Sequence, residues 1–312
     1  MSFIIRRLAT GMVTVLSVTL ISFFIFNIIP GDPARIILGY DADDSAVNSL
    51  REKLDLDSPL SIRYVNWFTG ILKGDFGESI GYKKPVTEII SESLEPTVSI
   101  TFLSLIISLV ISIPLGIKSA IKHNKNTDLI ITVSSQIGVV IPSFWLGILL
   151  LMVFSQYLRI FPFGSYTNFG DNFFEWLKSI ILPSLSLGLI SSSVLTRVVR
   201  SSFLENMKED YVRTAKSKGL FRSKIIYKHI FKNSLIPILT MAGLQLASII
   251  AGTIIIENVF SIPGLGRLLL YSVQRRDLPV VQGIVLWIAL TTVIVNLIVD
   301  LIHLIADPRL RR

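Results

Sequence analysis

Residues Glu209 to Lys232 read EDYVRTAKSKGLFRSKIIYKHIFK, and this basic stretch lies between two long apolar segments. From Arg197 to Lys232 the chain holds ten Lys or Arg residues against three acids, which makes this its largest positive loop. Cytoplasmic loops of membrane proteins carry an excess of Lys and Arg. We therefore expect residues 197–233 to face the cytoplasm and the flanking apolar segments to cross a membrane.

The pattern within this stretch predicts two short helices with different apolar faces. Val212 and Ala215 share one helical face, and Phe221 and Ile225 begin another. Gly219 can adopt the left-handed backbone conformation that ends one helix and starts the next at a new angle. Such a basic, partly apolar knob is suited to docking into a groove of another protein.

These residues resemble the cytoplasmic coupling loop of ABC-transporter permeases, whose shared pattern is Glu-Ala-Ala, three further residues and Gly. Here the pattern falls on Arg213, Thr214, Ala215 and Gly219, with two of the four letters changed. The resemblance is to the dipeptide, oligopeptide and nickel importer branch of that family. It implies that the following residues couple the chain to an ATPase subunit: Asp210, Tyr211, Val212, Arg213, Thr214, Ala215, Lys218, Gly219, Leu220, Phe221 and Arg222.

The most specific resemblance lies further along the chain, in ENVFSIPGLGR from Glu257 to Arg267 and in RDLPVV from Arg276 to Val281. PGDPA at Pro30 to Ala34 and DPRLR at Asp307 to Arg311 also resemble the family, so that the likeness covers essentially the whole chain. It implies docking of an extracytoplasmic binding protein on the outer segments, residues 30–96 and 257–279. The residues expected there are Glu257, Phe260, Pro263, Gly264, Arg267, Arg276 and Asp277.

Composition alone points to an integral membrane protein. The chain has 312 residues, of which 51% are hydrophobic and only 17% are charged. A soluble domain of this length would carry more charge and shorter apolar runs. The formal net charge of +8 is concentrated between apolar spans, so membrane lipids and an acidic partner explain it better than nucleic acid does. With no cysteine, the chain has no disulfide and no thiolate metal site.

We predict an all-α polytopic fold with six transmembrane helices, as in permeases of type I ABC importers. The apolar runs that are long enough to span a bilayer cover residues 8–29, 97–117, 129–158, 179–196, 237–256 and 281–303. The third run is longer than a bilayer requires, so a tilt or a kink at Pro142 is expected. All six spans form one transmembrane permease domain, residues 1–312.

The polar segment 30–96 is expected outside the membrane, with short helices over 45–54, capped by Ser45, and over 62–72. When segment 30–96 is left out of the count, the inner loops and tails hold eighteen Lys or Arg residues and the outer loops hold five. This asymmetry places both termini in the cytoplasm of a cell-membrane protein.

Catalytic and metal sites are not indicated. A phosphate-binding G-x-x-x-x-G-K-[ST] motif is missing from the sequence, so the chain is not expected to hydrolyse ATP or to bind a cofactor itself. His123, His229 and His303 share no helical face. Asp300 and Asn296, one turn apart, are a candidate intramembrane site, although capping or pairing with a base such as Arg197 explains them at least as well.

The family resemblance implies an importer in which separate subunits use ATP and Mg²⁺. The expected partners are a second, similar permease, two ATP-binding subunits, an extracytoplasmic solute-binding protein and membrane lipids. Neutral polar side chains such as Ser134, Ser135, Gln136, Ser143 and Gln245 could line a passage or only bond neighbouring helices. Peptides are the expected cargo, and nickel or a metal-chelator complex is the alternative. A secondary transporter driven by an ion gradient, or an intramembrane enzyme, would need paired charges or catalytic side chains that the spans lack.

Overall fold

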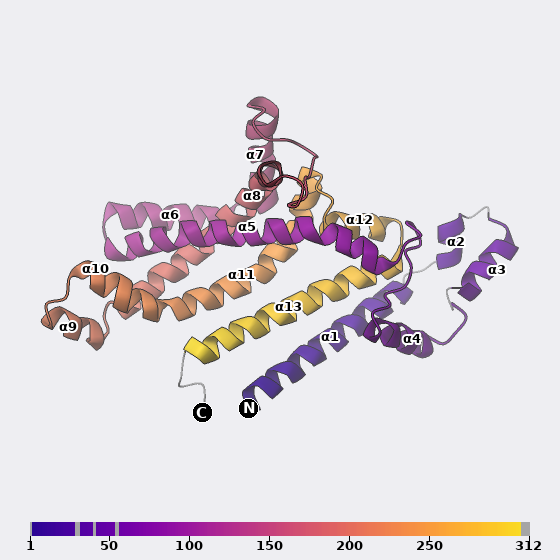
Figure 1. Cartoon of the computed structure of the whole chain (residues 1–312), viewed down its shortest axis with the longest axis horizontal. Coiled ribbons are helices and arrows are strands. Elements are labelled where there is room, and N and C mark those ends of the chain that lie inside the picture. The colour runs from indigo at the N-terminus through magenta and orange to yellow at the C-terminus, as the bar shows by residue number, and fades with distance from the viewer. Residues whose placement is uncertain (1, 29–31, 40–41, 54–55, 307–312) are drawn as a thin grey trace. The chain divides into compact units, whose positions relative to one another are not determined.

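The computed structural model describes residues 2–28, 32–39, 42–53 and 56–306. In this part of the chain the secondary structure is helical, apart from one isolated β-bridge between Glu78 and Pro85 (Figure 1). Pro30, Gly31 and the motif at 307–311 lie outside the described residues. The helices are α1 (Ser2–Ile28), α2 (Pro33–Leu38), α3 (Asp44–Lys53), α4 (Leu60–Leu72), α5 (Val86–Ile121), α6 (Asn126–Val140), α7 (Ser143–Leu150), η1 (Leu151–Tyr157), α8 (Phe173–Asn206), α9 (Asp210–Ser217), α10 (Arg222–Lys224), η2 (Ile225–Ile230), α11 (Phe231–Phe260), α12 (Leu265–Gln274) and α13 (Leu278–Ala306).

The described residues contain five helices that are long and apolar enough to cross a membrane, and a sixth span if one bent pair is counted. That pair consists of α6 and of α7 with its π-helical continuation η1, which meet at an angle of 97°. Pro142 lies at the break and directly precedes α7. The predicted kink at Pro142 is therefore confirmed, and it is a sharp turn between two helices.

Three predicted span boundaries are wrong because the helices run beyond the predicted apolar runs. The fifth span was expected to start at Pro237, but Pro237 lies inside α11. α5 begins at Val86 and passes through Pro96 and Pro114, whereas the sequence suggested a start at residue 97. α8 runs on to Asn206, ten residues past its predicted end at 196. Val199 and Phe203 in that extension are buried, so packing keeps the helix going into the basic segment.

The chain forms two compact units, and each is described by itself. The first consists of Met1–Glu95 with Pro263–Val293, the second of Pro96–Ile262 with Ile294–Arg312. The expectation of one domain over residues 1–312 stays a prediction.

The first unit has an apolar core between the start of α5, α12 and the start of α13. Val86, Ile90, Leu265 and Ile284 are among its buried side chains. The predicted helices in the 30–96 segment are present as α3 and α4, but the predicted cap is wrong: α3 starts at Asp44, and the Ser45 hydroxyl inside its first turn donates to the Asp43 carboxylate. Helix α2 was not predicted, and Asp32 caps it by accepting a hydrogen bond from the backbone N–H of Ala34.

The second unit is built around α8, which packs against α6, α7 and α11. Small residues let these helices approach closely. A Cβ atom added to Gly188 of α8 would lie 2.7 Å from Ile107 Cγ2 and 2.9 Å from the Ser104 carbonyl oxygen, both in α5. The close packing that the sequence indicated around Gly188 is thus present, and it fixes the spans that carry the basic segment.

Candidate functional site

The predicted coupling segment forms a short helix, a glycine turn and a second helical start. α9 ends at Ser217, and Gly219 has a φ of +71°, in the left-handed region. The turn is closed by a hydrogen bond from the Gly219 N–H to the Lys216 carbonyl oxygen, at 2.9 Å. α10 begins at Arg222 and continues through η2 into α11. The predicted break at Gly219 is confirmed.

The inner face of α9 is buried in the chain's own core. Val212 is 2% exposed and Ala215 is 6% exposed. They belong to a cluster of buried side chains from the last turns of α5, from α8, and from η2 and α11: Ile117, Ala120, Leu195, Val199, Phe203, Ile225, Ile226, Ile230 and Ile238. The sequence suggested that Val212 and Ala215 fill a partner's groove. The structure instead uses them to fasten α9 to the spans.

The other predicted coupling residues lie on the outer side of this segment. Phe221 is 81% exposed, which is unusual for an aromatic side chain among charged neighbours. Tyr211 and Leu220 are half-buried against the cluster, and the Tyr211 hydroxyl donates to Asn206 Oδ1 at 3.0 Å. The remaining members are exposed in the structure: Asp210, Arg213, Thr214, Lys218, Gly219 and Arg222. α9 and α10 therefore present a basic rim with one apolar side chain to the surroundings.

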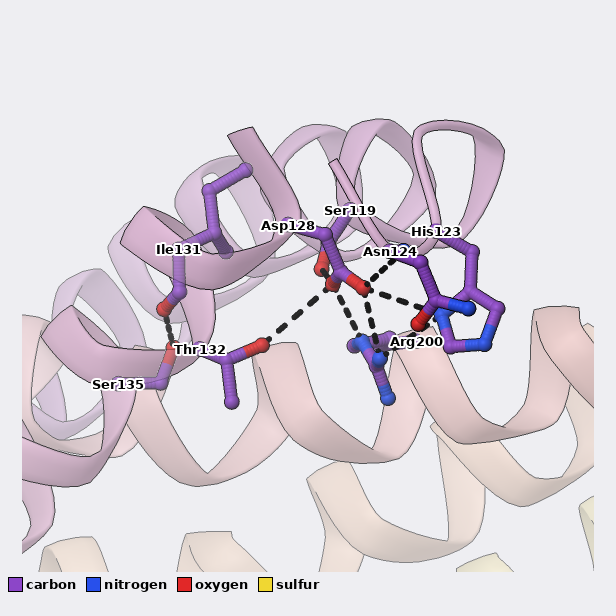
Figure 2. A network of polar contacts seen from close by, with 8 residues as sticks. All are labelled: Ser119, His123, Asn124, Asp128, Ile131, Thr132, Ser135 and Arg200. Atoms are coloured by element: carbon purple, nitrogen blue, oxygen red, sulfur yellow. Dashed lines mark hydrogen bonds and ion pairs between the residues drawn. The ribbon is translucent and has the colours of Figure 1, made fainter. Parts of the chain in front are cut away.

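The sequence did not indicate an ion pair between a buried carboxylate and a partly exposed arginine, which Figure 2 shows. Arg200 of α8 donates from Nε to Asp128 Oδ1 at 2.7 Å and from Nη2 to Asp128 Oδ2 at 2.9 Å. Asp128, in the first turn of α6, also accepts hydrogen bonds from the Ser119 hydroxyl of α5 and from the Asn124 backbone N–H, the latter at 3.0 Å. His123 Nδ1 lies 3.0 Å from Asp128 Oδ2 and 3.2 Å from Arg200 Nη2.

This network joins three helices at the same end of the unit that carries α9. Asp128 is only 4% exposed, and its carboxylate receives bonds from α5, α8 and the loop before α6. A bidentate Arg–carboxylate pair is geometrically specific as well as strong. Sequence reasoning missed it because Asp128 stands one residue before the predicted third span and was counted with the loop.

Two of the predicted docking residues, Glu257 and Phe260, lie in the last turns of α11 in the second unit, and both are buried. The Glu257 side chain is fully enclosed and accepts a hydrogen bond from the Thr97 hydroxyl of α5 at 2.5 Å. Their placement corrects the expectation that these two side chains contact a binding protein directly. They hold α11 to its neighbours instead.

The other five docking residues belong to the first unit. Pro263 and Arg267 are exposed, Arg276 is half-buried, and Gly264 and Asp277 are buried. The Asp277 carboxylate accepts hydrogen bonds from the Ser79 hydroxyl at 2.5 Å and from the Gly81 backbone N–H at 3.0 Å. Asp277 therefore connects the loop before α5 to the start of α13. Because Asp277 and Gly264 are buried, the expectation that they contact the binding protein directly is also corrected.

The membrane-embedded polar candidates show no shared site. Ser135 donates to the Ile131 carbonyl oxygen at 2.8 Å, and Gln245 donates from Nε2 to the Ser191 carbonyl oxygen at 2.8 Å. Ser135 therefore bonds within its own helix and Gln245 bonds to a neighbouring helix. This agrees with the alternative that these polar side chains hold helices together and do not line a passage. Ser134, Gln136 and Asn296 are exposed, while Ser143 and Asp300 are half-buried. In the described part of the chain, no three His, Cys, Asp or Glu residues are grouped so that they could hold a metal ion.

Comparison with sequence families gives two matches that together span most of the chain. Residues 112–312 match the family described as "Binding-protein-dependent transport system inner membrane component". Residues 1–101 match the family described as the N-terminal part of such membrane components.

Similar full-length proteins include a putative peptide transport system permease protein of Brucella abortus. It is 37% identical over 310 residues, which is 99% of this chain and 99% of that protein. The glutathione transport system permease protein GsiC of Salmonella typhimurium is 37% identical over 311 residues, covering 100% of this chain and 99% of that protein.

Among solved structures, the chain resembles a chain of the inward-facing MetNI methionine ABC transporter. The TM-score is 0.57 at 16% sequence identity, over 71% of this chain and 97% of that chain. A chain of an amino acid ABC transporter gives a TM-score of 0.52 at 16% identity, over 70% of this chain and 94% of that chain. At this identity the likeness concerns the fold.

Proposed function

The chain belongs to the family of inner-membrane components of binding-protein-dependent transport systems, and from this premise we propose how it imports its cargo. The family resemblance and the all-α importer fold that the sequence indicated are confirmed. The protein is a multi-pass permease subunit of an ABC importer in the cell membrane, and such an importer works with an ATPase and a substrate-binding protein.

We propose that α9 and α10 receive the motion of an ATP-binding subunit and pass it directly to the spans. The main evidence for this proposal is that Val212 and Ala215 are buried in one cluster with Ile117, Leu195 and Val199. Because these side chains share one core, α9 cannot shift without the ends of α5 and α8. The Asp128–Arg200 pair extends the connection to α6.

The contact with the ATP-binding subunit would be made by the exposed side of the segment. Phe221 would fill an apolar pocket, and Arg213, Lys218 and Arg222 would pair with acids on the partner, all four being exposed here. We place this side in the cytoplasm on the Lys and Arg asymmetry of the loops, which also places both termini there. ATP and Mg²⁺ act in the partner, and this chain supplies no ATPase site of its own.

We further propose an assembly of this chain with a second, similar permease, two ATP-binding subunits and one extracytoplasmic binding protein. Pro263 and Arg267, both exposed in the first unit, are the docking residues that this assembly would use. Their exposure favours a direct contact with the binding protein. The buried residues of the predicted docking set would instead stabilise the fold of the segment that docks.

Peptides are the cargo that we propose. The relatives described above are named for peptide and glutathione transport, and glutathione is itself a small peptide. Those names favour peptides over the nickel complexes that the sequence left open.

The test is uptake by the assembled importer. The chain is co-expressed with its ATP-binding subunits, second permease and binding protein, reconstituted in proteoliposomes, and offered radiolabelled di- and tripeptides, glutathione and a nickel chelate. We expect peptide accumulation that requires enclosed ATP. Accumulation of the nickel chelate that peptides do not compete with would overturn the cargo assignment, and accumulation without ATP would overturn the mechanism.

A further inference from the structure

Helix α4 (Leu60–Leu72), in the first unit, is apolar on two sides. Its sequence, LSIRYVNWFTGIL, holds a single charged residue, Arg63. One side carries Ile62, Val65 and Leu72, which are 50%, 56% and 71% exposed. A helix of a water-exposed segment would turn polar side chains to that side. This exposed apolar face therefore requires a cover.

The opposite side of α4 packs against α1 through aromatic rings. Phe23 of α1 is buried, and its ring centroid lies 5.3 Å from that of Tyr64 and 5.8 Å from that of Trp67. The Tyr64 hydroxyl lies 3.1 Å from Thr19 Oγ1, also in α1. These contacts fix the position of α4 along the length of α1.

That position is in the half of α1 that is farther from the N-terminus. The helix ends at Ile28, and the apolar run in its sequence covers residues 8–29. At 1.5 Å per residue, Phe23 lies about 8 Å and Thr19 about 14 Å from the Ile28 end of the helix. Figure 1 shows α4 beside the end of α1 that is farther from the N-terminus. The α4 helix thus packs on the part of the span that approaches the membrane interface, where Trp and Tyr side chains are enriched.

The face of α1 beyond these contacts is itself apolar and exposed, for example at Ile21 and Ile25. In a membrane span such side chains face lipid, so the exposed face of α4 continues a lipid-facing surface. By contrast α3, DSAVNSLREK, in the same segment, is rich in charged and polar residues. Only α4 of these two neighbours has the composition of an interfacial helix.

We propose that α4 is an interfacial membrane helix whose Ile62, Val65 and Leu72 face is covered by lipid acyl chains. It would brace the end of α1 against the bilayer and set the depth of the first span. The lipid contact rests only on α1 being a membrane span. Its assignment to the outer leaflet rests on the topology proposed above.

The absence of cysteine from the chain makes the proposal directly testable. Single variants Ile62→Cys, Val65→Cys and Leu72→Cys carry a nitroxide spin label in the assembled, reconstituted importer. Collision rates are measured with oxygen, which concentrates in hydrocarbon, and with chromium oxalate, which stays in water. Ile21→Cys on α1 is the lipid-facing reference, and Asn48→Cys, exposed on α3, is the water-facing reference.

We expect the three α4 labels to show an oxygen-to-chromium collision ratio severalfold above that of the Asn48 label and close to that of the Ile21 label. A ratio like that of Asn48 would overturn the proposal in favour of a solvated helix. Low collision rates with both reagents would overturn it in favour of a protein cover, such as the second permease. Peptide uptake by the same labelled samples reports on the proposed function separately.

Discussion

Arg200 and Asp128, 72 residues apart in the sequence, form a two-point ion pair between α8 and the first turn of α6. Asp128 is buried and Arg200 keeps about a quarter of its side chain exposed, at 26%. The two partners therefore differ in what happens when one is removed, because only the arginine can recover contact with water.

Arg200→Ala is expected to destabilise the protein more than Asp128→Asn does. The alanine leaves a buried carboxylate without its cation, which costs about 3–5 kcal/mol. The asparagine leaves a partly exposed arginine and still accepts one hydrogen bond, so about 1–3 kcal/mol is expected. Thermal unfolding followed by tryptophan fluorescence in detergent gives the order, with Arg197→Ala, an exposed arginine on the same helix, as control. Equal losses for the two variants would mean that the pair is not the main contact of Asp128.

Gly219→Val is expected to lower ATP-driven uptake while leaving membrane insertion unchanged. No atom lies within 4 Å of a Cβ added at Gly219, so the cost comes from its φ of +71° alone. Other residues pay about 1–2 kcal/mol in this conformation, and asparagine tolerates it best. Gly219→Asn is the matched control and should keep most of the uptake. Wild-type uptake by Gly219→Val at normal protein levels would remove the turn from the coupling mechanism.

Gly188→Ala is expected to reduce stability by about 1–3 kcal/mol through overpacking. The added Cβ would meet the Ser104 carbonyl oxygen of α5 at 2.9 Å, and a backbone atom cannot move aside easily. Gly170→Ala, where a Cβ meets nothing within 4 Å, should be neutral. The two variants are compared by thermal unfolding, and similar midpoints would show that α5 and α8 are not in close contact in the protein.

Arg267→Glu and Asp277→Ala are expected to act in different ways. The exposed Arg267 should affect affinity for the binding protein, with little change in thermal stability. Loss of the buried Asp277 carboxylate leaves the Ser79 hydroxyl and the Gly81 N–H without this acceptor, at a cost of about 1–3 kcal/mol. Binding measurements with the purified binding protein and unfolding curves separate the two effects. A loss of stability with Arg267→Glu would assign that residue to the fold.

Much of the fold could be predicted from the sequence because long apolar runs and loop charge follow directly from the bilayer. The break in the third span at Pro142 and the left-handed turn at Gly219 could be predicted because proline and glycine have strong backbone preferences. The start of α5 and the end of α8 could not be predicted in this way. Pro96 lies inside α5, and the packing of Val199 and Phe203 extends α8.

The sequence located the candidate site along the chain but did not show which of its side chains are buried. A motif identifies a loop, yet it does not tell which side chains face inward. Val212, Ala215, Glu257 and Asp277 resemble family positions and turned out to be buried supports. The Asp128–Arg200 pair carries no local signal, since its partners meet only when α6 and α8 pack together.

The central claim is that α9 moves as one body with the ends of the spans. It is tested most directly by the distance between spin labels at Lys216→Cys on α9 and Lys118→Cys on α5, both exposed in a chain without other cysteines. Pulsed electron resonance is recorded on the reconstituted importer without nucleotide and after trapping with ATP and vanadate, with loss of ATPase activity confirming the trap. We predict the same distance distribution in both states, because the shared core of Val212, Ala215 and Ile117 stays intact. A shift of the main distance on trapping would contradict the account.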